Sequence, residues 1–160
     1  MAIDIRGIAP LLFVFDMPAA IHFYRDVLGV EVVSTSGGGD NCGWALLKLN
    51  GVEVMLNTEY DDGERPAVPD PARVTGHADT CLYFGLEDLD GAYQHLRAQG
   101  CDVNEPKVAY YGMRQLYVRD PDGFGLCFQW PASREMQEQW RKWYGTGEQS
   151  TREAADALTR

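Results

Sequence analysis

Residues 110–114 combine side chains that are well suited to hold a small molecule. Tyr110 and Tyr111 are followed closely by Arg114. A tyrosine ring can stack on a planar compound or attract a cation to its face, and an arginine offers five N–H donors to carbonyl or carboxyl groups. This stretch is therefore a candidate wall of a binding pocket. A core hairpin that carries a surface arginine is the alternative interpretation.

The chain after Tyr111 is predicted to form a β-hairpin. Two runs rich in apolar and aromatic residues, 114–119 and 124–130, flank an Asp-Pro-Asp-Gly turn at 120–123. The proline fixes φ for a turn, and the glycine can take the positive φ that closes it. Side chains alternate along a strand, which places on one face Arg114, Leu116 and Val118, and on the other Gln115, Tyr117 and Arg119.

The composition favours a globular protein of one domain, or of two small halves that share a core. The chain has 160 residues, of which 45% are hydrophobic and 11% aromatic. A chain of this length can bury about 70% of its unfolded surface without disulfides or metals. The formal net charge of −10 argues against a nucleic-acid partner, which would need clustered Lys and Arg, and is compatible with a cationic ligand.

Other features bear on location. No apolar run approaches the ~20 residues of a membrane span, so we expect no membrane partner. The first residues lack the basic and apolar regions of a signal peptide. The cysteines at 42, 81, 101 and 127 are widely spaced and form no CxxC pair, which is typical of reduced thiols. We therefore expect a cytoplasmic protein.

The elements that would position these residues follow one order twice. The first unit, residues 1–57, begins with a strand at 8–15 and a helix that Asp16 caps and Gly29 ends. A strand at 30–34 follows. Strands at 43–49 and 52–57 then meet at Asn50-Gly51, a strong hairpin signal.

The second unit, residues 79–130, repeats the pattern after a polar, proline-rich linker at 58–78. A strand at 80–85 leads to a helix that Asp88 caps and Gly100 closes, followed by a strand at 101–104 and the hairpin. Each unit thus reads strand, helix, three strands. One such unit leaves a sheet face uncovered, so two must pack to bury a core or enclose a cavity.

Residues 131–160 form a C-terminal helical extension. Ser133 can cap a helix whose apolar stripe consists of Met136, Trp140, Trp143 and Tyr144. We expect this stripe to dock on the chain's own fold, with another protein chain as the alternative. Residues 150–153 resemble a capping box that begins a short last helix.

Three motifs together resemble the vicinal oxygen chelate superfamily, which includes glyoxalase I, bleomycin-resistance proteins and extradiol dioxygenases. They are Val14-Phe15-Asp16, Phe23-Tyr24-Arg25-Asp26-Val27-Leu28-Gly29 and the Asp-Pro-Asp-Gly turn. The resemblance implies an α+β fold in which two βαβββ units form a half-open mixed β-barrel with flanking helices. It also suggests a homodimer.

The resemblance also indicates where a metal would bind. Metal-dependent members place His, Gln or Glu at four strand positions that correspond here to Ala9, Met55, Cys81 and Cys127. None of these is a His or a carboxylate, so we expect no metal and no cofactor. Two thiolates could hold zinc if His77 supplied a third ligand, but buried cysteines more often act as small hydrophobes.

The pattern is closest to the metal-free bleomycin-resistance branch, where an aromatic residue precedes Gly-Met-Arg at the place of Tyr111. The resemblance therefore implies sequestration of a small aromatic or cationic compound, as in antibiotic resistance. The alternative is a glyoxalase-like lyase or dioxygenase with unusual ligands, and Glu53 is a conceivable lone base or a solvated strand residue. The expected ligand-binding residues, each of which could instead belong to the core, are Phe13, Trp44, Met55, Cys81, Tyr83, Tyr110, Tyr111, Arg114 and Cys127.

Overall fold

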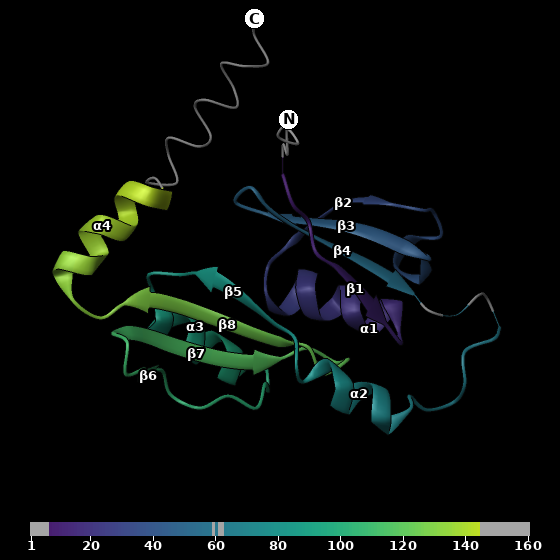
Figure 1. Ribbon diagram of the computed structural model, residues 1–160. Helices are drawn as coiled ribbons and strands as arrows, with labels where there is room; N and C mark the ends of the chain where they lie inside the picture. Colours follow the sequence, from purple (N-terminus) through teal and green to yellow (C-terminus); the bar gives the residue numbers. More distant parts are fainter. Residues whose placement is uncertain (1–6, 59, 61–62, 145–160) are drawn as a thin grey trace, which may run out of the picture. The chain divides into compact units, whose positions relative to one another are not determined.

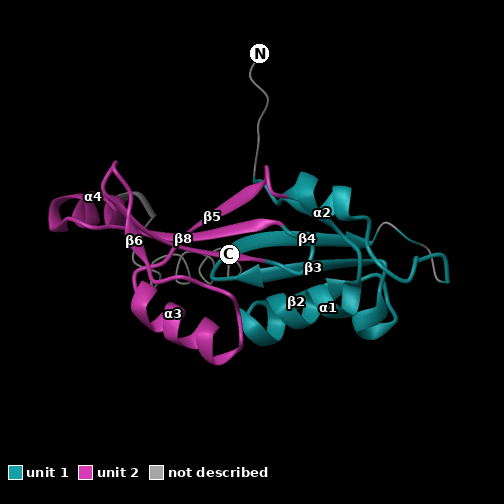
Figure 2. Cartoon of the chain, turned by 90° about the horizontal axis from the view of Figure 1, so that it is seen from below, with its two compact units in different colours: residues 1–77, 120–123 teal, residues 78–119, 124–160 magenta. Residues whose placement is uncertain are grey.

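The computed structural model describes residues 7–58, 60 and 63–144 (Figure 1). They fall into two compact units: unit 1 lies within Met1–His77 and Asp120–Gly123, and unit 2 within Ala78–Arg119 and Phe124–Arg160 (Figure 2). Each unit holds one four-stranded mixed sheet with helices beside it. The α+β class and the two-unit plan are thus confirmed. The described strands form two separate sheets and are not closed into a barrel.

Unit 1 follows the predicted order, with its sheet arranged β1-β4-β3-β2 and β1 parallel to β4. Its elements are β1 (Leu11–Val14), α1 (Met17–Ile21), the π-helical η1 (His22–Val27), β2 (Glu31–Thr35), the short 3-10 turn η2 (Gly39–Asn41), β3 (Trp44–Leu49), β4 (Val52–Thr58) and α2 (Pro71–His77). Asp16 caps α1 as predicted, because its carboxylate accepts the Ala19 N–H at 3.2 Å. The single regular helix expected here is instead an α-helical turn that continues as a π-helix.

Two stretches of unit 1 compare the prediction from adjacent residues with the structure. The hairpin at Asn50-Gly51 is confirmed, since φ is 48° and 83° at these residues. The stretch 58–78, predicted as a linker, contains the helix α2 in its last part, which was not predicted. Asp70 accepts the Ala72 N–H at 2.9 Å and Pro71 starts the helix, which together make a helix-start signal inside the polar stretch.

Unit 2 repeats the plan with its sheet arranged β5-β8-β7-β6 and β5 parallel to β8. Its elements are β5 (Cys81–Gly85), α3 (Leu89–Ala98), β6 (Lys107–Val108), β7 (Met113–Arg119), β8 (Gly125–Pro131) and α4 (Arg134–Tyr144). Asp88 caps α3 by accepting the Gly91 N–H at 2.8 Å, as expected. The strand predicted at 101–104 is wrong. Val103 is buried without a ladder partner, and the short β6 pairs with β7 instead.

The C-terminal helix α4 docks on its own unit, as predicted. Ser133 accepts the Met136 N–H at 3.3 Å, and the Trp140 ring lies 6.3 Å from that of Trp130 on β8. The side chains of Trp143 and Tyr144, and the capping box at 150–153, lie outside the described residues. Over the part of the chain that the structure describes, every helix is too short or too polar to cross a bilayer.

In unit 2 the helix α3 covers one face of the sheet (Figure 1). The buried Leu116 and Val118 of β7 share a face with Arg114, which binds Asp90 of α3, so this is the helix side. The opposite face of β7 carries Gln115 and Tyr117. That face is where the remaining polar and aromatic side chains gather.

Candidate functional site

The candidate site lies on the sheet face of unit 2 that α3 leaves uncovered. Strand register brings its members together. Tyr83 of β5 lies opposite Cys127 of β8, which in turn lies opposite Tyr117 of β7. In the same way Gln115 lies opposite Gln129. We call this surface the tyrosine–glutamine face and define it by Tyr83, Tyr111, Gln115, Tyr117 and Gln129.

Hydrogen bonds link all five side chains of the tyrosine–glutamine face. The hydroxyls of Tyr83 and Tyr117 are 3.3 Å apart, and Tyr117 donates to Gln115 Oε1 at 3.2 Å. Gln115 Nε2 donates to the Tyr111 hydroxyl at 2.6 Å and to Gln129 Oε1 at 3.0 Å. Gln115 is 8% exposed, whereas Tyr83, Tyr111 and Tyr117 are 53%, 46% and 49% exposed. A buried amide therefore holds two half-exposed rings directly, and it holds the third, Tyr83, through Tyr117.

The rings are arranged edge to face, which leaves ring faces open. Tyr83 and Tyr117 have centroids 6.5 Å apart and planes at 88°, and Tyr110 and Tyr111 have centroids 5.1 Å apart and planes at 86°. Tyr110 is fully exposed. The Tyr117 hydroxyl has a raised pKa because of its hydrogen bond to Tyr83, with burial as the second cause. The Tyr117 phenol therefore stays neutral at physiological pH.

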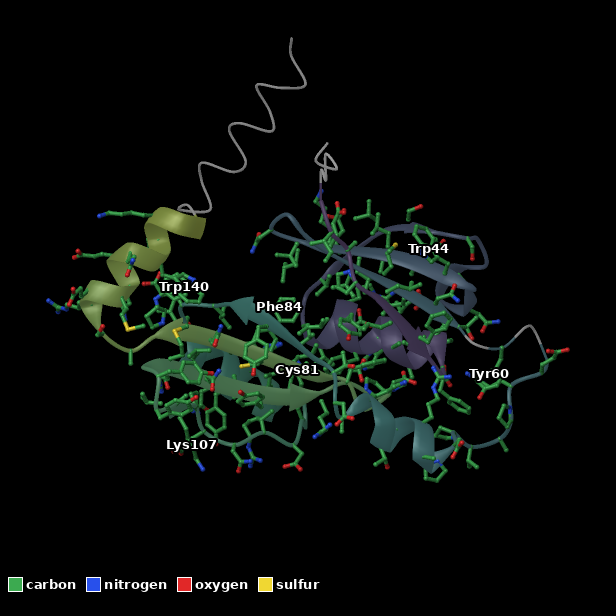
Figure 3. The ribbon with its side chains drawn as sticks, viewed as in Figure 1. Trp44, Tyr60, Cys81, Phe84, Lys107 and Trp140 are labelled. Carbon is green, nitrogen blue, oxygen red and sulfur yellow. The ribbon has the colours of Figure 1, made fainter. Side chains whose placement is uncertain are left out.

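A hollow of about 250 Å³ adjoins the tyrosine–glutamine face within unit 2. It shares Gln115 and Tyr117 with that face, and its other lining residues are Asn104, Glu105, Lys107, Val108 and Ala109. Lys107 lies on β6, an edge strand of this sheet (Figure 3). Pockets that enclose drug-sized ligands measure roughly 300–1,000 Å³. This hollow is therefore sized for part of a ligand, with the rest lying over the exposed rings.

The two cysteines near the face are neutral thiols. Burial raises the pKa of Cys127, which is fully buried, and that of Cys81 on β5 (Figure 3). His77, the suggested third zinc ligand, belongs to unit 1, where its Nδ1 lies 2.7 Å from the Asp122 carbonyl oxygen. Within residues 7–58, 60 and 63–144 no three His, Cys, Asp or Glu side chains cluster as metal ligands. The zinc alternative therefore gains no support from the geometry.

Most of the predicted site residues fall on one sheet face in each unit. In unit 1, Phe13 and Trp44 both pair with Asn57, and Met55 pairs with Leu11 and Leu46, so all three predicted side chains share a face. In unit 2, the predicted Cys81, Tyr83 and Cys127 share the face that holds Tyr111. Glu53 forms an exposed ion pair with Lys48 at 3.2 Å, which fits a solvated strand residue.

Arg114 is the predicted site residue that lies elsewhere. It is on the α3 side of the sheet, where Nη1 and Nη2 donate to Asp90 at 2.7 and 2.6 Å. This guanidinium also lowers the pKa of Asp90. Gln115, Tyr117 and Gln129 instead provide the polar groups of the face, and they were absent from the predicted set. Strand alternation already separated Gln115 from Arg114, and the hairpin register would have added Gln129.

A family model and several solved structures match this chain. The family model described as the Glyoxalase/Bleomycin resistance protein/Dioxygenase superfamily matches residues 7–128. A glyoxalase/bleomycin resistance protein/dioxygenase from Nocardioides is 22% identical over 80% of this chain and 85% of its own, with a TM-score of 0.59.

Two further structures have the same fold. TioX from Micromonospora sp. ML1 is 18% identical over 77% of this chain and 98% of its own, with a TM-score of 0.58. A lactoylglutathione lyase from Agrobacterium tumefaciens is 22% identical over 78% of this chain and 92% of its own, with a TM-score of 0.56. The helix α4 (Arg134–Tyr144) follows the matched region 7–128 and is an addition to it.

Proposed function

Because the chain belongs to the Glyoxalase/Bleomycin resistance protein/Dioxygenase superfamily, whose model matches residues 7–128, we propose that it binds and sequesters a small aromatic or cationic compound without a metal. The observation that carries this proposal is the tyrosine–glutamine face. Its aromatic rings are held by a buried amide and yet remain half exposed. A surface of this kind is organised before a ligand arrives, which reduces the ordering that binding requires.

Ring contacts and charge support the choice of ligand. Aromatic pairs and cation–π contacts each contribute about 0.5–2 kcal/mol, and Tyr83, Tyr111 and Tyr117 offer several such faces. The net charge of −10 attracts cations to the protein as a whole. The face itself consists of tyrosine and glutamine side chains, so stacking and hydrogen bonding would select among the attracted compounds.

The other predicted residues take different places in this proposal. We place Tyr110 and Cys81 at the margin of the face and Cys127 beneath its rings. Phe13, Trp44 and Met55 remain proposed ligand contacts because they share the open face of the sheet in unit 1. Arg114 has a structural role in the proposal, since its donors are bound to Asp90.

Binding of a panel of planar aromatic and cationic compounds, measured by calorimetry with and without EDTA, tests the proposal. At least one probe should bind, and the chelator should leave its affinity unchanged. Replacing Tyr111 with Ala should weaken that binding by about 1–2 kcal/mol while the melting temperature changes little, because the ring is 46% exposed. Tyr60→Ala, in unit 1, is the control and should keep full affinity. Failure of the whole panel, or loss of affinity in EDTA, would contradict the proposal.

We also propose that the protein is a homodimer. The position of β1 supports this, because β1 is an edge strand of the sheet in unit 1 and its Leu11 side chain, 43% exposed, adds apolar surface there. An exposed apolar edge favours association with another chain. Light scattering at micromolar concentration should give twice the chain mass, and the mass of a single chain would refute dimerisation. A cytoplasmic location stays a prediction.

A further inference from the structure

We infer that Gln129 and Gln115 make this face selective for a planar ring with a hydrogen-bonding group in or near its plane, and that the two amides can turn to match either a donor or an acceptor on that ring. This inference rests on the proposed function, since it concerns the same tyrosine–glutamine face. It goes beyond that proposal because stacking alone accepts any planar ring, whereas the two amides favour a ring that carries a hydrogen-bonding group over one that carries none.

The arrangement of donors and acceptors begins at the buried Gln115. Its Oε1 accepts from Tyr117, and both N–H groups are used, one toward Tyr111 and one toward Gln129. The amide therefore has no donor left for a ligand. The groups that remain available to a ligand are therefore those of Tyr111 and Gln129. These two residues lie next to each other, because both contact Gln115 Nε2.

The outer groups present donors in this arrangement. Tyr111 accepts from Gln115, so its own O–H can donate to a ligand. Gln129 accepts through Oε1, and its Nε2 makes no hydrogen bond to the residues that the structure describes. A ligand oxygen, such as an aromatic carbonyl, would therefore meet two adjacent donors.

The same network can be satisfied with the opposite polarity. Exchanging the oxygen and nitrogen atoms of both amides keeps each of the three bonds around Gln115 and reverses its direction. Tyr111 would then donate to Gln115, and Gln129 would present its carbonyl oxygen to a ligand. The 2.6 Å separation between Gln115 and Tyr111 fits an O–H···O bond at least as well as an N–H···O bond.

Two coupled amide flips therefore let one surface accept either kind of ligand. An aromatic carbonyl selects the arrangement with outward donors, and an aromatic amine selects the one with an outward carbonyl. A ring without a polar substituent would desolvate Gln129 without giving it a partner, which weakens binding. Gln129 is thus the residue that sets specificity, and Gln115 is the positioning residue that couples it to the tyrosines.

Two fluorescent probes with the same three-ring frame test this assignment. Acridone carries a carbonyl acceptor, and 9-aminoacridine carries an amino donor. Gln129→Glu leaves only acceptors at this position, so it should weaken acridone about tenfold while 9-aminoacridine binds as well or better. Gln129→Met removes both functions and should weaken both probes about fivefold, the factor that corresponds to one net hydrogen bond.

The matched control is Gln94→Glu on α3, which adds the same charge at an exposed position of the helix that covers the other face. It should change neither affinity by more than about twofold. Because 9-aminoacridine is a cation at neutral pH, a pure effect of charge would tighten its binding and leave the neutral acridone unchanged, and that result would overturn the inference. Equal shifts of both probes in the same direction would overturn it as well, since position 129 would then not distinguish an acceptor from a donor. Full affinity in Gln129→Met would overturn it as well.

Nuclear magnetic resonance of the free protein separates this inference from the proposed function. If the network reverses, the Gln115 side-chain amide protons should show contacts to the rings of both Tyr111 and Tyr117. Contacts to one ring alone would mean a fixed polarity and would refute the reversible network. Wild-type protein that binds neither acridine would instead count against the proposed function, and the amide contacts would still decide between the two polarities.

Discussion

Replacing Tyr24 with Phe should destabilise the protein by about 2 kcal/mol. Tyr24 lies in η1 and is 2% exposed, and its hydroxyl donates to Asp120 Oδ2 at 3.0 Å. Asp120 is itself only 5% exposed. Burial, followed by the charge of Asp120, holds the pKa of Tyr24 well above its ordinary range. The phenol is therefore a permanent donor to a buried carboxylate.

The size of the effect follows from what the substitution leaves behind. A hydrogen bond to a charged group contributes about 1.5–3 kcal/mol, and a buried acceptor that loses its donor retains the desolvation penalty. Asp120 still accepts the Asp122 N–H at Oδ1 at 3.0 Å, which places the loss near the middle of that range. Phenylalanine preserves the ring, so the cavity left is only that of one oxygen atom.

Urea unfolding followed by circular dichroism measures this loss directly. Tyr60→Phe is the matched control, because it removes from another unit 1 tyrosine a side-chain hydroxyl that makes no hydrogen bond to the described residues, whereas the backbone oxygen that accepts from Thr58 is kept. Its free energy of unfolding should change by less than about 0.5 kcal/mol. Equal stability of wild type and Tyr24→Phe, or equal losses in the two variants, would show that the bond to Asp120 contributes nothing specific.

Three further predictions follow from single residues. Gly112 and Gly100 both have a positive φ, of +85° and +79°, but a Cβ on Gly112 would lie 3.3 Å from the Met136 sulfur of α4, whereas a Cβ on Gly100 would meet open space. Gly112→Ala should therefore lower thermal stability by more than Gly100→Ala. Equal losses would mean that α4 shifts to make room for the Cβ at no cost in stability. Burial raises the pKa of Asp122 above its ordinary value of 3.8, so its contribution to stability is present below pH 3.8 and is lost as the pH rises through the folded-state pKa. Denaturation across this range should show that fall in wild type and not in Asp122→Asn, and parallel profiles would contradict it. Arg114→Gln should reduce the free energy of unfolding by less than about 1 kcal/mol and leave the affinity for 9-aminoacridine unchanged. A tenfold loss of affinity would instead show that Arg114 contributes to ligand binding.

Features set by a few adjacent residues could be predicted from the sequence. Asp16 and Asp88 cap helices as expected, and Asn50-Gly51 forms the hairpin turn. In each case the signal and the structure it specifies lie within three or four residues, so packing elsewhere has little power to override them.

Features that depend on a distant partner could not be located in the same way. The strand expected at 101–104 is replaced by β6, because Lys107 and Val108 are the residues that meet Gln115 and Arg114 of β7. Burial of Val103 gives that segment an apolar role without a ladder. An apolar run therefore predicts that a segment is buried, but not which segment fills the edge of the sheet.

The candidate site shows the same limit at the scale of one strand. Alternation correctly divided β7 into a face with Arg114, Leu116 and Val118 and a face with Gln115 and Tyr117, but it did not say which face a helix covers. The aliphatic pair decides this, because α3 brings its buried Leu89 and Leu96 to the sheet and packs where apolar area can be removed from water.

Arg114 lies on that covered face, partly exposed, and is paired there with Asp90. Had the aliphatic character of the two faces been weighed first, Gln115 and Tyr117 would have been placed on the open side and Arg114 against the helix. The hairpin register then brings in Gln129, fourteen residues from Gln115 along the chain. On an open sheet face, the best candidates for ligand binding are therefore the polar residues that alternate with aliphatic ones along the strand. The most reactive side chain of the strand is a poorer guide, because it can lie on the covered face.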